Sequence, residues 1–175
     1  MAEVEVFTPT GVLAGLTAGV PLSTSGPDLT SALAVREARW FPLHGGAAEP
    51  RRETQVAPDD VLILVAAQPA VLVHMTWYSV TLDLGPYRVT GELATHPGFV
   101  PEQSLARPGS TFVALRDARI ELLDEAGAGA ADRAHIHVNR YAVERVVSSL
   151  MLGHYFPGAS LLTPETVAAE TVAAG

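Results

Sequence analysis

The sequence contains neither cysteine nor lysine, and all 11 of its basic residues are arginines. Without cysteine the chain cannot form disulfides, thiolate nucleophiles, iron–sulfur clusters or cysteine-built zinc sites. Without lysine it has no P-loop lysine and no amine that forms a Schiff base. These two absences exclude several large classes of enzyme.

Positive charge is also scarce, because 19 acidic residues outweigh the 11 arginines and give a formal net charge of -8. An acidic chain repels phosphates, so we expect neither a nucleic acid nor an anionic membrane surface as a partner. The longest apolar stretch, 61–73, is interrupted by Gln68 and Pro69 and is shorter than the roughly 18 to 20 residues of a membrane-spanning helix. The first residues do not resemble a signal peptide, so we expect a cytoplasmic protein.

Alternating apolar and polar residues dominate what is present. Five segments have this period of two, namely 3–7, 80–84, 88–93, 118–122 and 135–138, and the period is typical of half-buried strands. The 15 glycines and 13 prolines fall between such runs, as in a chain with frequent turns. Helical patterns are short, and the two candidates cover 28–35 and 101–106. The sequence therefore predicts an all-β fold with short helical turns.

One six-residue segment occurs twice. Residues 35–40 read VREARW and residues 115–120 read LRDARI, with three identities and one Glu/Asp exchange. The flanks align as well: Gly15 precedes its match Gly91 by 76 positions, and Leu64 precedes its match Val146 by 82. Small loop insertions explain the drift in offset. We interpret the chain as two copies of one unit, 2–67 and 78–151.

Each copy has the same predicted plan, in which two strands, a short helical turn, a third strand through the repeated segment and a polar loop precede a final strand or hairpin. This order fits a small barrel of about five strands. A unit of about 70 residues buries only about 60% of its unfolded surface, so we expect the two barrels to pack together. A C-terminal extension, 152–175, follows them, and its tail from 163 is expected to be flexible.

The second copy resembles the Sm-like barrels, a group of small SH3-like β-barrels. The matching residues are Val80, Leu82, Gly91, Leu93, Leu115, Asp117 and Ala118. They reproduce two strands with a glycine in the second, followed by a strand that ends in a hydrophobic-x-Asp pair. The second Sm signature, an apolar residue before Arg-Gly, is replaced by VNRYAVERVVSS, and Asn139-Arg140 before Val143 is similar to a bacterial group of uncharacterised small domains. The resemblance implies assembly into rings or dimers through strand edges. Sm-like proteins also bind RNA, which the missing signature and the net charge argue against.

Four arginines recur at matching positions of the repeat, and these are Arg36, Arg39, Arg116 and Arg119. Glu37, Asp117 and Glu121 are close to them in sequence. One interpretation is structural ion pairing at a barrel rim or between the copies. The other is a binding site for an anion or carboxylate, built from arginines of both copies.

Two histidines, His135 and His137, lie two residues apart on a predicted strand and therefore point the same way. They are candidate metal ligands, with His96, His154 or Glu144 completing the shell. The competing interpretation places the intervening apolar residues in the core and both histidines in solvent or against a partner. No GxSxG motif of a hydrolase occurs, and no cofactor is expected.

The C-terminal run 146–162 is dense in large apolar residues, including the candidate binding residues Tyr155 and Phe156. It is interpreted either as a segment that covers an open sheet edge or meets another subunit, or as a core strand. Together these features favour a non-enzymatic protein that forms a homo-oligomer or binds a protein partner through strand edges and this segment. The alternative is a metal- or small-molecule-binding protein, or an enzyme, that uses His135 and His137.

Overall fold

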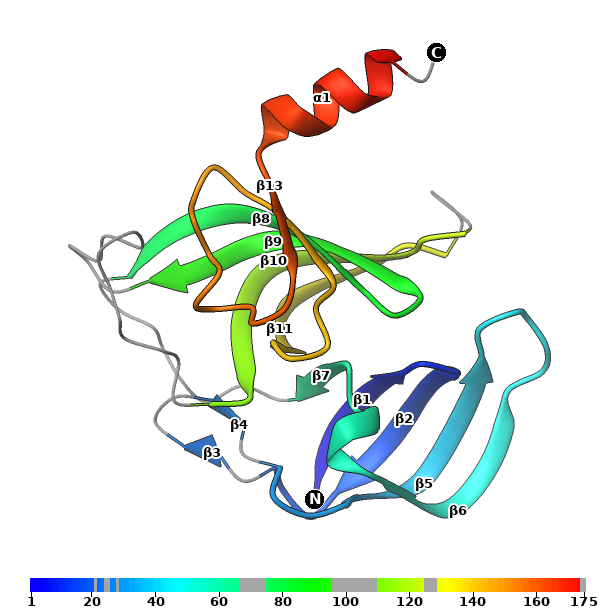
Figure 1. Ribbon diagram of the computed structural model, residues 1–175. Helices are drawn as coiled ribbons and strands as arrows, with labels where there is room; N and C mark the ends of the chain where they lie inside the picture. Colours follow the sequence, from blue (N-terminus) through cyan, green and yellow to red (C-terminus); the bar gives the residue numbers. More distant parts are fainter. Residues whose placement is uncertain are drawn as a thin grey trace. The chain divides into compact units, whose positions relative to one another are not determined.

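The computed structural model describes residues 1–20, 22–23, 26–27, 29–66, 75–95, 110–124 and 129–173, and strands make up most of this part (Figure 1). The strands are β1 (Ala2–Thr8), β2 (Gly11–Thr17), β3 (Leu22–Ser23), β4 (Gly26–Pro27), β5 (Leu33–Pro42), β6 (Glu49–Val56), β7 (Ile63–Ala66), β8 (Thr76–Leu84), β9 (Tyr87–Thr95), β10 (Phe112–Leu122), β11 (Ala131–Asn139), β12 (Arg145–Val147) and β13 (Ser160–Leu162). A 3-10 turn, η1 (Pro58–Asp60), precedes β7, and the helix α1 (Pro164–Ala173) follows β13. The all-β prediction is confirmed.

Eleven of the described strands form one sheet that does not close on itself. Their order is β13-β12-β8-β9-β10-β11-β7-β1-β2-β5-β6, and β3 and β4 form a separate two-stranded sheet. Contacts divide the described residues into two compact units. Unit 1 holds β1 to β7, the start of β10 and the end of β11, and unit 2 holds β8, β9, the remainder of β10 and β11, and everything from Arg140 onward.

Unit 1 buries the apolar face of its strands in one core. The core residues are Val4, Val6, Leu13, Leu33, Val35, Ala38, Val56, Val61, Leu64 and Phe112. In β1 the two buried valines alternate with Glu3 and Glu5, whose side chains lie on the opposite face. This alternation is the pattern that identified the strand in the sequence.

Unit 2 buries a second set of apolar residues, which come from its strands and from the turn after β12. They are Val80, Leu82, Leu84, Tyr87, Val89, Leu93, Leu115, Ala118, Ile120, Val143, Val146, Leu152 and Phe156. In β8 and β9 every second residue is buried over most of the strand. The period of two in the sequence therefore reflects burial on one face here as well.

The strands of the two units pair in matching register. In unit 1, Val6 lies opposite Leu64 in the antiparallel pair of β1 with β7. In unit 2, Leu82 lies opposite Val146 in the antiparallel pair of β8 with β12. The sequence offsets of 76 and 82 residues convert the first pair into the second.

A β-bulge also recurs at the same place. The register of β2 with β5 shifts between Ala14 and Leu16, and the register of β10 with β9 shifts between Arg116 and Arg119. At the bulges, Glu37 has φ of 49° and Asp117 has φ of 48°. These left-handed values are unusual for residues with a side chain, and the two residues are the Glu/Asp exchange in the repeated segment.

One helical prediction fails. A helical turn was expected over 28–35, but residues 33–35 belong to β5, where Leu33 lies opposite Val56 and Val35 lies opposite Thr54. Both apolar side chains are buried in the unit 1 core, and this burial outweighs the local helical pattern. The second helical candidate, 101–106, lies outside the described residues.

The C-terminal residues 164–173 form α1, whose described side chains are mostly exposed. Thr163 accepts a hydrogen bond from the backbone N–H of Thr166 at 3.3 Å, which caps the first turn. No helix in the described ranges combines the length and the apolar character that a membrane crossing requires.

The two bulge glycines provide a test of how tightly the strands approach. A Cβ added at Gly15 would lie 2.6 Å from the carbonyl oxygen of Arg36, and one at Gly91 would lie 3.1 Å from that of Arg116. We expect Gly15→Ala to lower the free energy of unfolding by about 2 kcal/mol, and Gly91→Ala to lower it by about 1 kcal/mol or less. Urea unfolding followed by circular dichroism measures both, and equal effects would contradict the closer approach at Gly15.

Candidate functional site

The strand β6 ends the eleven-stranded sheet, and no strand among the described residues pairs with its outer edge (Figure 1). Its inner edge pairs with β5 from Glu49 to Val56. Side chains along β6 are mostly exposed and include Pro50, Arg51 and Arg52. Charged residues and proline are typical of exposed edge strands, because they limit unspecific pairing with other chains.

The strand β12 has its second edge covered by β13. The two pair in parallel from Arg145 opposite Ser160 to Val147 opposite Leu162. The backbone N–H of Ser160 donates to the carbonyl oxygen of Glu144 at 2.8 Å. The N–H of Ser148 donates to that of Leu162 at 3.1 Å. This edge is therefore closed by a strand of only three residues.

The C-terminal run contributes partly to the core of unit 2. Leu152 and Phe156 are fully buried, so the Phe156 ring packs inside the unit and does not reach its surface. Tyr155 is half-buried, with its ring centroid 6.4 Å from that of Phe156, and burial raises the pKa of its hydroxyl. Met151, by contrast, is 56% exposed. Both interpretations of this run therefore hold for different residues.

A buried arginine holds the turn before β13. Arg140 is 3% exposed, and its Nη1 donates to the carbonyl oxygens of His154 at 3.3 Å and Tyr155 at 3.4 Å. Its Nη2 donates to the Tyr141 hydroxyl at 2.8 Å, and its guanidinium lies over the ring of that residue. These contacts attach residues 154–155 to the turn after β11.

The repeated arginines pair with acidic residues within their own units. Arg36 Nε lies 3.2 Å from Glu53 Oε2, and the two residues face each other across β5 and β6. Arg116 Nε donates to Glu92 Oε2 at 2.7 Å, again across a strand pair. Sequence reasoning missed both partners, because only the strand register brings them opposite the arginines.

The remaining two arginines differ from one another. Arg119 Nε donates to Glu121 Oε1 at 2.7 Å, and its Nη1 lies 3.6 Å from Asp132 Oδ1. Glu121 was the acidic neighbour noted in the sequence. Arg39 is exposed on β5. The anion site built from both copies stays a prediction.

Arg116 makes one more contact that has no counterpart in unit 1. Its guanidinium carbon lies 3.9 Å from the ring centroid of the half-buried Trp77. The position that matches Trp77 in the first copy is Met1, which is 72% exposed. Stacking on the indole and pairing with Glu92 hold this guanidinium in one place.

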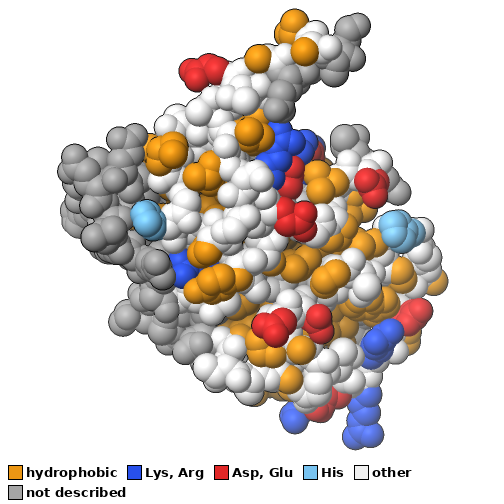
Figure 2. Space-filling model, in the orientation of Figure 1, with side chains coloured by type: hydrophobic (Ala, Val, Ile, Leu, Met, Phe, Trp, Pro, Cys, Tyr) orange, Lys and Arg blue, Asp and Glu red, His pale blue; other side chains and the backbone are white. Residues whose placement is uncertain are grey.

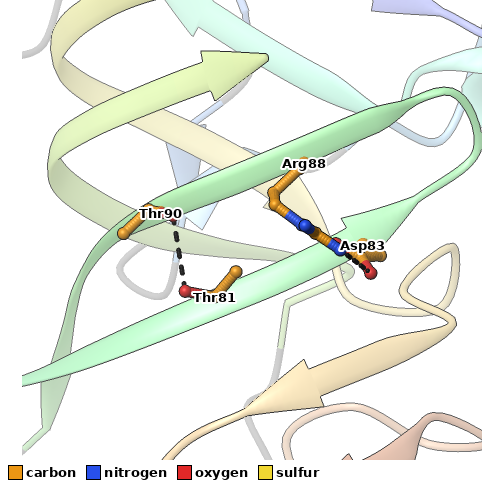
Figure 3. Close-up of polar contacts among 4 residues, drawn as sticks. All are labelled: Thr81, Asp83, Arg88 and Thr90. Atoms are coloured by element: carbon orange, nitrogen blue, oxygen red, sulfur yellow. Dashed lines mark hydrogen bonds and ion pairs between the residues drawn. The ribbon is translucent and has the colours of Figure 1, made fainter. Parts of the chain in front are cut away.

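The same outer face of β8 and β9 carries further polar contacts (Figure 3). Arg88 donates two hydrogen bonds to Asp83, of 2.7 and 2.8 Å, and Thr81 and Thr90 share one of 3.3 Å. The hydrogen bond from Asp83 raises the pKa of Arg88. On the visible face of the molecule, charged groups of both signs are scattered among apolar ones (Figure 2). These side chains bind one another, which suits a structural role.

The two candidate metal ligands are in different environments. His135 is exposed, whereas His137 is 4% exposed and lies opposite Leu64 of β7. Burial lowers the pKa of His137 to about 4, and the nearby His135 adds a smaller effect in the same direction. The expectation that both histidines meet solvent is therefore wrong for His137. Residues Ile136 to Asn139 are all buried, so both faces of this part of β11 are covered and alternation does not distinguish them.

The metal hypothesis stays a prediction. Within the described ranges, no group of three or more histidine, aspartate or glutamate residues is placed to hold a metal ion. His96, one of the proposed additional ligands, lies outside those ranges. Glu144 is exposed, and its carboxylate accepts a hydrogen bond from the backbone N–H of Gly85 at 3.3 Å.

The buried His137 makes stability depend on pH. The folded chain keeps this imidazole neutral down to about pH 4, while the unfolded chain takes up the proton from about pH 6.5. Stability is therefore complete above pH 6.5 and falls by up to about 3 kcal/mol as the pH drops to 4. We expect His137→Gln to remove this part of the loss and His135→Gln to retain it, as measured by urea unfolding at pH 7.5 and 4.5. Identical pH dependence in the two variants would contradict the buried, neutral imidazole.

The Arg116 contacts predict a difference between the matched arginines. Arg116→Gln removes a stacked, ion-paired guanidinium and is expected to lower the free energy of unfolding by about 1 to 1.5 kcal/mol. Arg36→Gln removes an exposed ion pair and is expected to cost about 0.5 kcal/mol or less. Chemical denaturation measures both, and Trp77 fluorescence should change only in the first variant. An Arg36 effect as large as that of Arg116 would argue against the stacking contribution.

Comparison with protein-family models, with curated proteins and with solved structures gave no match. The edges of β6 and β12 are the features from which a function can be argued. One is open among the described strands, and the other is closed by three residues of the C-terminal segment.

Proposed function

We propose that this chain is a non-enzymatic protein of two tandem Sm-like, SH3-like barrels that assembles with itself or binds a protein partner through strand edges. The barrels would comprise 2–67 and 78–151, and the C-terminal extension would begin at 152. The open edge of β6 is the observation that carries the proposal.

The duplication is supported by the strand order. The order β7-β1-β2-β5-β6 in one half of the sheet is repeated as β12-β8-β9-β10-β11 in the other. Both halves have a bulge opposite a glycine, and both have an acidic residue with positive φ at the bulge. A shared strand order with shared irregularities is difficult to explain without a common origin for the two halves.

The binding role is supported by the chemistry of a strand edge. An edge strand presents N–H and C=O groups in a row, and an added strand can bind to them through main-chain hydrogen bonds. The sheet already contains such a pair, since β11 lies beside β7 although 64 residues separate Ala66 from Ala131 in β11. Near the opposite end, Met151 is exposed, and Leu161 and Leu162 are half-exposed. These side chains supply apolar surface for a partner.

Hydrogen exchange combined with light scattering tests this function. We expect either a mass above 18.4 kDa for the full chain as its concentration rises, or capture of an extended peptide from a displayed library. In both cases the backbone amides of β6 should gain protection, whereas those of the β8–β9 hairpin should not change. A chain that stays monomeric and selects no peptide, or that gains protection only away from β6, would contradict the proposal.

A further inference from the structure

We infer that β13 occupies the edge of β12 at which β6 of a second copy of this chain would pair, so that the C-terminal segment restrains head-to-tail assembly. This inference rests on the proposed function, because it takes the open edge of β6 as a binding surface. It adds the partner, the pairing register and the element that controls access.

A pairing within unit 1 provides the pattern. There β7 pairs with β1 on one side and with β11 on the other, both antiparallel. His137 lies opposite Leu64, and Val138 lies opposite Ile63. The backbone N–H of Asn139 donates to the carbonyl oxygen of Leu62 at 2.9 Å and closes the end of the pair.

The offset of 82 residues between the copies applies to both of these strands. It places β6 at the position of β11, with Gln55 matching His137 and Val56 matching Val138. It likewise places β12 at the position of β7, as the matched registers of β1 with β7 and of β8 with β12 illustrate. The unit 1 contact therefore has a counterpart between chains, in which Gln55 of one copy lies opposite Val146 of another.

The counterpart contact is blocked in the folded chain. It needs the carbonyl oxygen of Glu144, which lies 82 residues after Leu62 and matches the acceptor of the Asn139 N–H. That oxygen already accepts the N–H of Ser160 at 2.8 Å. Because β13 runs parallel to β12 along the same edge, it excludes the antiparallel β6 of a second copy.

The blocking strand can leave without opening the core. Its pairing with β12 covers three residue pairs, Ser160 is exposed, and Leu161 and Leu162 are only half-buried. The fully buried anchors of the preceding turn, Leu152 and Phe156, lie before it in the chain. Loss of residues beyond 159 therefore uncovers the edge while these anchors remain.

The resulting contact is heterologous, because β6 and β12 are different strands. Each added copy again presents one free β6 and one free β12, so assembly proceeds head to tail into a ring or a filament. A covered β12 edge stops this growth, even though β6 remains open.

Two variants that release the edge test the inference. One ends at Ala159, and the other is Ser160→Pro, which removes the N–H that donates to Glu144. Ser160→Ala keeps that N–H and is the matched control. By light scattering, the full chain and Ser160→Ala should remain at 18.4 kDa, whereas both released variants should at least double in mass as concentration increases.

The absence of native cysteine allows the register to be tested directly. In the predicted contact, Thr54 of one chain faces Val147 of the next. We expect truncated chains carrying Thr54→Cys, mixed with truncated chains carrying Val147→Cys, to form an interchain disulfide under mild oxidation. Ser79→Cys, an exposed position on β8, replaces Val147→Cys in the control mixture and should give at least tenfold less cross-linked product.

Each other outcome overturns the inference. Released variants that unfold cooperatively yet stay monomeric would show that the β12 edge does not accept β6. Variants that lose cooperative unfolding would make β13 an essential part of the core, and assembly without the Thr54–Val147 cross-link would refute the register. A full chain that assembles as strongly as the released variants would refute the restraint by β13 while supporting the proposed function, whereas protection of β6 by another protein would leave the proposed function intact without this inference.

Discussion

Backbone N–H and C=O groups need hydrogen-bond partners, and the outermost strands of an open sheet have one edge without them. The described strands of this chain meet this constraint in three ways. The free edge of β7 pairs with β11, and the edge of β12 pairs with β13. The edge of β6 carries charged residues and a proline that water can surround. The organisation of the sheet, and the function proposed for it, follow from these three solutions.

The bulges fix how each half of the sheet bends. Gly15 and Gly91 let the neighbouring strand approach so closely that a Cβ would meet its backbone. Glu37 and Asp117 accept the left-handed conformation that the extra residue of a bulge requires. Sharp local twist of this kind lets a short sheet wrap around its own apolar face. The core of each unit is buried as a consequence, although the sheet as a whole is open.

Matched positions have acquired different surroundings in the two halves. Arg36 makes an exposed ion pair across its strands, whereas Arg116 also stacks on Trp77. The β11 position pairs with another strand, and the matching β6 position does not. An element that one half uses internally is therefore available to a second molecule in the other half. This difference, and not the repeated pattern itself, is what gives the chain a surface for binding.

The sequence by itself determined the properties that depend on neighbouring residues. The period of two identified most of the long strands, and the glycine and RxAR matches identified residues that share one pairing register. The absence of cysteine and lysine likewise excluded whole chemistries without any structure.

Only the tertiary structure decided the partners. The acids that pair with Arg36 and Arg116 lie 17 and 24 residues away, and His137 is buried because a strand distant in sequence lies beside it. The same holds for the residues expected to be helical at 33–35, which the core draws into β5. Strand pairing joins residues whose separation in sequence carries no local signal, so burial, ion pairs and open edges follow from the fold and not from the pattern of any single segment.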